Sequence, residues 1–178
     1  MQVSACLVTR GDVDMTVILN SLPFDDVVVW DNSVREDLKC YGRFAAVAEA
    51  KHDIIYTQDD DLMVPIPALL KAWDDDTGIL ANKPVGEEWL FLGCGSLFNK
   101  NLVAPSFDRY LEAYAHEADT DELHKTADVV FAYQNPYRSV WLGYLDFPWQ
   151  TADNRMYKDH DHYGSRSRTR DKTLCLTV

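Results

Sequence analysis

Three apolar segments near the start of the chain each end in a group of polar side chains. The segments Val3–Val8, Val27–Trp30 and Ile54–Tyr56 are rich in the β-branched and aromatic residues that are typical of buried strands. Apolar residues at helical spacing lie between them, over 15–22 and 43–50. This β-α-β-α-β order leaves connections long enough for parallel pairing. It predicts an α/β fold with an open, mostly parallel sheet flanked by helices.

The third segment leads directly into three consecutive carboxylates, Asp59-Asp60-Asp61. In open α/β sheets, ligands bind outside the carboxyl ends of the strands. Adjacent carboxylates repel one another unless a cation joins them, and Mg²⁺ or Mn²⁺ is commonly held by one or two carboxylates together with phosphate oxygens. The triplet therefore predicts a metal site, with a solvated acidic loop as the alternative. A second triplet, Asp74-Asp75-Asp76, has no strand before it, and we assign it to a surface turn.

Composition limits the class of protein. The 178 residues fit one domain with one core, and 47% hydrophobic residues without a membrane-length apolar run indicate a globular chain. The start of the chain lacks a signal-peptide pattern, and the four cysteines form no close pairs, which favours reduced thiols in a cytoplasmic protein and argues against structural zinc. The net charge of −12 opposes general attraction to nucleic acid or anionic membranes.

The end of this acidic chain is locally basic. Six lysines and arginines lie between Arg155 and Lys172. Such a segment fits a disordered tail, a nucleic-acid contact, or a flap that folds onto a phosphorylated ligand.

The second half of the chain has less regular patterns. We expect helices over Pro67–Trp73, Phe107–His116 and Asp121–Ala127, and strands over Gly78–Ala81, Asp128–Tyr133 and Ser139–Leu142, the last two joined by a turn at Asn135-Pro136. In Gly93-Cys94-Gly95-Ser96, two glycines allow close backbone approach to a ligand or a neighbouring strand, or form a bulge beside the core. We find no repeat or linker, so a second domain is not expected.

Taken together, the three strand ends resemble a known family. Thr9-Arg10-Gly11-Asp12, Asp31-Asn32-Ser33 and Asp59-Asp60-Asp61 follow one another as in the nucleotide-sugar-dependent glycosyltransferases of the GT-A fold, of the exostosin-like or family 2-like kind. The resemblance covers roughly the first hundred residues well and the remainder loosely. It implies a single GT-A (Rossmann-like) domain with a nucleotide-sugar-binding half over 1–100, an acceptor and catalytic half over 101–150, and a C-terminal basic flap over 151–178.

The resemblance also implies roles for the residues at the strand ends. The acidic triplet looks like the family's DXD motif, with Asp59 and Asp61 as metal carboxylates for Mn²⁺ or Mg²⁺, Asp61 as the direct ligand, and Asp60 assisting or facing away. The nucleoside pocket would be lined by Thr9, Arg10 and Asp31. Arg43 resembles a family arginine that approaches the nucleotide, although a surface arginine paired with Glu49 or Asp37 is the alternative.

Further roles fall on the second half of the chain. Gly95, within the glycine segment, would lie beside the donor sugar. Asp128 is the first candidate for the base that deprotonates the acceptor, with Asp121 or Glu122 as the second; alternatively, Asp128 only begins a strand. The family often completes its metal site with a histidine from a C-terminal flap, here His162 or His160. The cationic groups that could neutralise the leaving diphosphate are Arg155, Arg166 and Arg168.

The partners are defined less closely than the chemistry. The donor would be a UDP- or GDP-linked sugar, and the acceptor could be a glycan, a protein or a nucleic-acid base. The loops 83–88 and 135–146 and the residues Trp89, Trp141 and Trp149 are acceptor candidates, against the alternative of core packing.

Two other functions stay open. The first is a nucleotidyltransferase acting on sugar phosphates, which usually carries a glycine-rich basic loop where this chain has Thr9-Arg10-Gly11-Asp12. The second is a non-catalytic module that binds carbohydrate or nucleic acid through the basic tail, although the acidity of the chain opposes nucleic acid.

Overall fold

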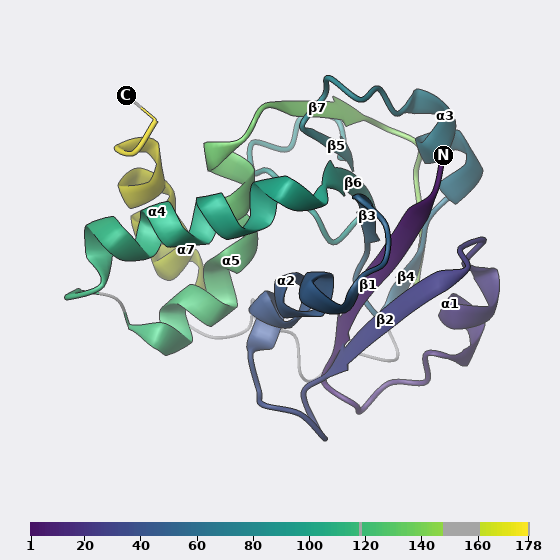
Figure 1. Ribbon diagram of the computed structural model, residues 1–178, viewed down its shortest axis with the longest axis horizontal. Helices are drawn as coiled ribbons and strands as arrows, with labels where there is room; N and C mark the ends of the chain where they lie inside the picture. The colour runs from purple at the N-terminus through teal and green to yellow at the C-terminus, as the bar shows by residue number, and fades with distance from the viewer. Residues whose placement is uncertain (118, 148–160, 178) are drawn as a thin grey trace.

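A six-stranded mixed sheet forms the centre of the molecule in the computed structural model, which describes residues 1–117, 119–147 and 161–177, without the side chain of His162. The strand order is β2-β1-β3-β6-β5-β7 (Figure 1). The strands are β1 (Val3–Thr9), β2 (Asp26–Asp31), β3 (Ile54–Thr57), β5 (Ile79–Asn82), β6 (Ser96–Asn99) and β7 (Tyr137–Val140). In this sheet β6 alone runs against its neighbours, since β1 pairs parallel with β2 and β3, and β5 pairs parallel with β7. The predicted α/β class with a mostly parallel sheet is confirmed.

Helices cover both faces of this sheet (Figure 1). One face carries α2 (Gly42–Ala46), α4 (Val103–Tyr114) and α5 (Thr120–Gln134), and the other carries α1 (Thr16–Ser21) and α3 (Ile66–Ala72). The last helix, α7 (His162–Leu174), packs against α5. Short 3₁₀ turns occur at η1 (Lys39–Tyr41), η2 (Val47–Glu49) and η3 (Lys100–Leu102).

The period-two alternation of strand side chains explains these layers. On β1, Val3 and Leu7 pack toward the α1 and α3 side, while Cys6 packs toward α2, α4 and α5. The core on the side of α2, α4 and α5 contains an aromatic cluster. In it, the Phe131 ring centroid lies 5.0 Å from that of Phe44 and 4.8 Å from that of Phe98. Each such side chain contributes about 1.5–3 kcal/mol when fully buried, so this cluster anchors the helices on the sheet.

A two-stranded ribbon lies apart from the main sheet. Strands β4 (Leu62–Met63) and β8 (Leu145–Asp146) pair antiparallel, with Leu62 opposite Asp146. The N–H of Phe147 also donates to the backbone oxygen of Asp61 at 2.6 Å. The ribbon therefore brings the second half of the chain against the acidic triplet.

Two expectations for the second half are wrong. The predicted strand Asp128–Tyr133 is the end of α5, which continues the expected Asp121–Ala127 helix to Gln134. Val130 and Phe131 are fully buried between the sheet and the neighbouring helices, and this packing overrides their preference for strands. The sequence also did not predict β6, which begins at Ser96, the last residue of the glycine segment.

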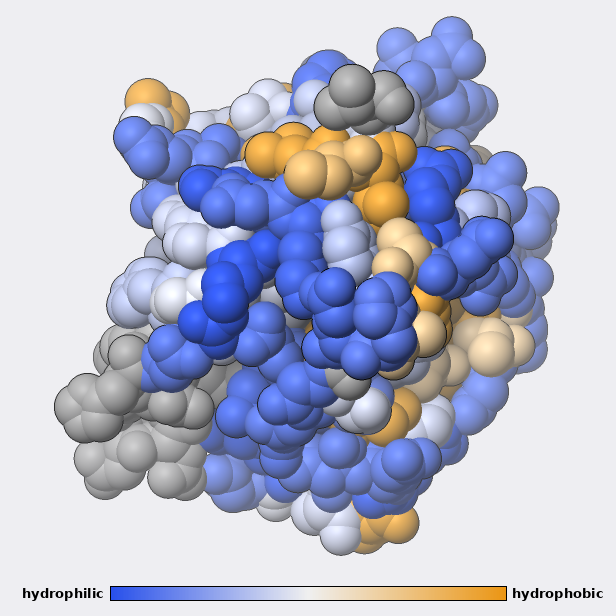
Figure 2. All heavy atoms as spheres, turned by 90° about the vertical axis from the view of Figure 1, so that its left-hand side faces the viewer, coloured by the Kyte–Doolittle hydropathy of each residue, from blue (hydrophilic) through white to orange (hydrophobic). Residues whose placement is uncertain are grey.

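The remaining expectations fare better. The leading strands, the strand near Gly78–Ala81 and the turn at Asp75-Asp76 are confirmed, and the last predicted strand is shifted to Tyr137–Val140. The described part of the basic segment is helical, which does not fit a disordered tail. The side of the molecule that carries α4, α5 and α7 is mostly hydrophilic (Figure 2). Within the described ranges, no helix combines the length and the apolar character needed to cross a membrane.

Candidate functional site

A cavity of about 440 Å³ lies at the carboxyl ends of β1 and β3. Its other walls come from η1, α5, α7, the segment before β6 and the ribbon strand β8. Many of the residues that the sequence nominated line it: Thr9, Arg10, Arg43, Asp59, Asp60, Asp61, Asp128 and Arg166. The structure thus gathers residues from both halves of the chain around one space.

Asp59 is held by its neighbours. Its carboxylate accepts a hydrogen bond from Arg43 Nη2 at 2.6 Å, and its N–H donates to the Gly93 carbonyl at 2.8 Å. A methyl group at Gly93 would come within 2.0 Å of Asp59 Oδ2, so a side chain there would displace the Asp59 carboxylate. The close contacts of the glycine segment are therefore with other parts of the protein: Gly93 lies against Asp59, and Gly95, at φ +98°, lies against Val64.

Asp60 has a carboxylate that is costly to ionise. Burial and, to a lesser extent, the charges of Asp59 and Asp61 raise its pKa from 3.8 to about 6, although the Thr9 hydroxyl and Arg10 act in the opposite direction. A carboxylate in this condition is stabilised by a nearby cation.

Asp61, which directly precedes β4, and Asp146, on the paired strand β8, both line the cavity. Together with Asp59 and Asp60 they offer carboxylate oxygens, the donors that suit Mg²⁺ and Mn²⁺. The described residues contain no group of three or more His, Cys, Asp or Glu side chains already converged on one point. Mg²⁺ commonly takes one or two protein carboxylates and completes its coordination with ligand phosphates and water.

Arg43 links two of the candidate carboxylates. Its side chain is only 2% exposed, and its guanidinium forms ion pairs with Asp59 at 2.6 Å and with Asp128 at 3.5 Å. Burial disfavours the charged form, but the charges of Asp128 and Asp59 outweigh it and raise the pKa of Arg43 above its ordinary value. The surface-arginine alternative does not fit, because Glu49 pairs with Arg35 and Asp37 pairs with Lys39.

Asp128 lies on α5, two residues after a kink at Thr126. Its side chain is 18% exposed and lines the cavity. Burial raises the pKa of Asp128, the charge of Arg43 opposes this, and the charge of Asp59 adds to it. A carboxyl group whose pKa is moved toward neutrality is suited to accept a proton near physiological pH.

Arg166 reaches the cavity from α7. Its guanidinium carbon lies 5.1 Å from the ring centroid of Trp89 and 5.2 Å from that of Phe91, and Arg170 lies 5.1 Å from Trp89. Arg166 Nε and Nη2 are buried and have no hydrogen-bond acceptor within the described part of the chain. Buried donors of this kind normally find a partner, so an anionic ligand in the cavity would complete them.

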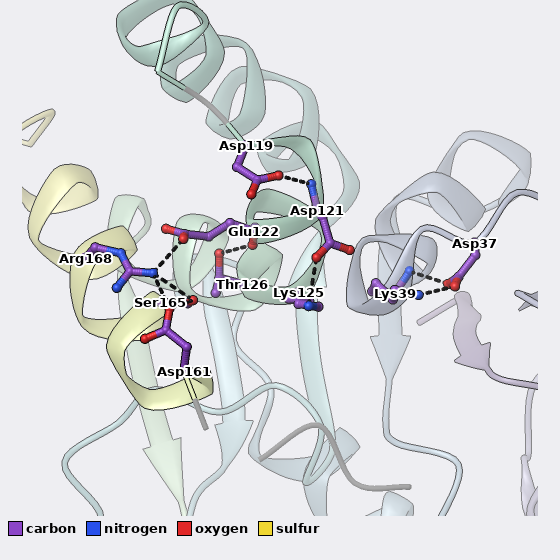
Figure 3. A network of polar contacts seen from close by, with 10 residues as sticks. All are labelled: Asp37, Lys39, Asp119, Asp121, Glu122, Lys125, Thr126, Asp161, Ser165 and Arg168. Carbon is purple, nitrogen blue, oxygen red and sulfur yellow. Dashed lines mark hydrogen bonds and ion pairs between the residues drawn. The ribbon is translucent and has the colours of Figure 1, made fainter. Parts of the chain in front are cut away.

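Other nominated residues lie elsewhere. Asp31 accepts from the N–H and hydroxyl of Ser33, at 2.8 and 2.6 Å, and does not line the cavity; neither does Gly95. Asp121 pairs with Lys125 at 2.8 Å, and Arg168 pairs with Glu122 and Asp161, each at 2.8 Å (Figure 3). Arg155, His160 and Trp149 lie outside the described residues, as does the side chain of His162.

Several lining residues were not anticipated. Asn32 lines the cavity in place of Asp31, and its side chain oxygen accepts from the N–H of Leu38 at 3.0 Å. A signal for it was present, since it belongs to the same polar strand end. Asp146 ends the nominated loop 135–146, but its position beside the triplet could not be found from sequence, because only the pairing of β4 with β8 brings it there. Tyr144, which also lies in the nominated loop 135–146, lines the cavity as well. The remaining unanticipated side chains that line it include Lys39, Cys40, Lys125 and Tyr163.

Comparison with models of known protein families gave no match to this chain, and comparison with curated protein sequences gave none either.

Proposed function

We propose that the protein is a metal-dependent glycosyltransferase of the GT-A type, moving a sugar from a nucleoside-diphosphate sugar to an acceptor. One observation carries the proposal: the acidic triplet after β3 and the incompletely bonded guanidinium of Arg166 face the same cavity. Carboxylates alone would suit a cation, and a guanidinium alone would suit an anion. Their combination suits a metal diphosphate, which needs both.

Each group has a role in this reaction. Asp61, with Asp59 or Asp146, would hold Mn²⁺ or Mg²⁺, which acts as a Lewis acid on the diphosphate. Arg166 would donate to the diphosphate oxygens as the bond from the anomeric carbon to the leaving oxygen breaks and its electron pair moves to the diphosphate. Asp128 would accept the proton of the acceptor hydroxyl as the new glycosidic bond forms. Arg43 would hold both Asp59 and Asp128 in place.

The first test is calorimetric titration of the chain with UDP, GDP and their common sugar conjugates, with Mn²⁺ and then with EDTA. Binding of one nucleotide only when metal is present supports the proposal and identifies the donor class. Binding of no nucleotide at any metal concentration contradicts it and favours the binding-module alternative. Nucleotide binding with incorporation of a nucleoside monophosphate into a sugar phosphate would favour the nucleotidyltransferase.

The decisive variant is Asp61→Ala, which should abolish metal-dependent nucleotide binding while leaving the far-ultraviolet circular dichroism unchanged. The chain offers a matched control in its second acidic triplet: Asp76→Ala removes a carboxylate from an exposed turn and should leave nucleotide affinity unaltered. Unchanged affinity in a folded Asp61→Ala protein would contradict the assignment of the metal ligand.

A further inference from the structure

We propose that Trp141, Tyr144 and Asp146 form a subsite for an uncharged sugar ring, which makes the acceptor a neutral saccharide. This inference deepens the proposed function and rests on it for the reaction, although the subsite itself can be tested without a nucleotide. Trp141 and Tyr144 follow β7, and Asp146 is the last residue of β8; Tyr144 and Asp146 line the cavity.

The loop after β7 carries an exposed aromatic pair. Trp141 is 46% exposed and Tyr144 is 40% exposed, and their ring centroids lie 5.8 Å apart in an edge-to-face arrangement. Tyr144 lines the cavity, whereas Trp141 lies outside its wall. Aromatic surface therefore continues outward from the place where the donor sugar would be bound. Large apolar side chains left in water beside a cavity are typical of binding surfaces.

Hydrogen bonds to a buried side chain fix the loop that carries this pair. The fully buried side chain of Asn82 accepts from the N–H of Leu142 at 2.9 Å and donates to the Gly143 carbonyl at 2.9 Å. The same amide donates to the Cys94 carbonyl, also at 2.9 Å. One buried side chain thus fixes the aromatic loop to the glycine segment that borders Asp59. A loop fixed in this way loses little conformational entropy when a ligand binds.

The side chains of this loop match the two kinds of surface on a sugar ring. A sugar ring has an apolar face of C–H groups and a rim of hydroxyls. Aromatic rings suit the face, and a carboxylate accepts hydrogen bonds from the hydroxyls. Asp146 supplies that carboxylate in the cavity wall, on the strand paired with β4. The net charge of −12 opposes the approach of a phosphate-rich chain, so a neutral saccharide is favoured over nucleic acid.

The direct test uses the whole chain and a panel of methyl glycosides of glucose, galactose, mannose and N-acetylglucosamine. Saturation-transfer nuclear magnetic resonance should detect at least one of them on the wild-type protein. Trp141→Ala should weaken that binding by about tenfold or more, and Trp141→Phe should retain most of it. The control Leu111→Ala removes a similarly exposed apolar side chain from α4 and should change nothing.

Two results would overturn the subsite: binding of no glycoside, or equal binding by wild type and a folded Trp141→Ala protein. If a nucleic acid or a polypeptide is glycosylated and no glycoside is, the neutral-saccharide assignment is wrong. Calorimetric nucleotide affinity separates this inference from the proposed function, because Trp141→Ala should leave it unchanged. A chain that binds glycosides at Trp141 but no nucleotide would keep the subsite and refute the glycosyltransferase.

Discussion

Asp26 and Asp60 lie at opposite ends of the strands, at the amino edge and the carboxyl edge of the sheet, and their pKa values are shifted in opposite directions. At the amino edge, the buried carboxylate of Asp26 accepts from the Lys51 N–H at 2.8 Å and from the Ser4 hydroxyl at 2.6 Å. The hydrogen bond from Lys51 contributes most, and that from Ser4 next, to lowering the pKa of Asp26. At the carboxyl edge, burial and crowding raise the pKa of Asp60 to about 6.

The difference separates structural groups from candidate functional ones. A buried polar group that serves the fold is fully bonded within it, as Asp26 is. Charges left with raised pKa values or incomplete bonding, as at Asp60, Asp128 and Arg166, cluster where a ligand would complete them. These three residues therefore mark the candidate site without reference to any protein family.

The largest effect should come from removing the cation that compensates two carboxylates. Arg43→Met leaves Asp59 and Asp128 without their shared partner and should lower the free energy of unfolding by about 3–5 kcal/mol. Urea unfolding followed by tryptophan fluorescence measures this. Arg35→Met is the control, because Arg35 forms a comparable but exposed pair with Glu49 and should cost far less. Equal decreases in the free energy of unfolding of the two variants would show that the burial of Arg43 does not strengthen its contribution to stability.

A smaller loss, of about 1–3 kcal/mol, is expected for Asp26→Asn, which weakens two hydrogen bonds at the amino edge. Because the pKa of Asp26 is lower in the folded chain than in the unfolded one, ionised Asp26 stabilises the fold above about pH 4. That contribution is lost as the pH falls through the folded-state pKa. The stability difference between wild type and variant should therefore be full at pH 7 and shrink below about pH 4. A difference that stays constant down to pH 2 would contradict this account.

The smallest effect should have the opposite sign. Asp60→Asn removes a charge that is repelled by Asp59 and Asp61, and without added metal it should raise the free energy of unfolding at pH 7 by about 1 kcal/mol. Chemical denaturation with EDTA present measures the change. A destabilised Asp60→Asn protein would place Asp60 with Asp26, among the groups that serve the fold.

The sequence predicted what depends on local pattern. Strands β1, β2 and β3 and their polar ends are visible because runs of β-branched and aromatic residues lie next to turn residues and acidic residues in the chain. Asp59, Asp60 and Asp61 were nominated for this reason, and the structure places all three on the cavity wall.

The sequence did not predict features that depend on contacts between residues far apart in the chain. Nothing local links Asp146 to the triplet, and nothing local reveals that Arg43 bridges to Asp128. The run Val129-Val130-Phe131 has the composition of a strand, but it packs as a helix because it is covered on every side. The aromatic loop after β7 was nominated only in outline, and its attachment to Asn82 becomes visible only in the fold.

The reversed direction of β6 has a consequence for engineering. Because β6 starts at the cavity edge and ends at the opposite one, the site receives the segment before this strand, while Lys100 emerges beside Asp53 on the far side. The turn at Asp75-Asp76, which precedes β5, lies on that far side as well. New chain termini made by circular permutation, or an inserted reporter domain, can be placed in this turn while the walls of the cavity stay continuous.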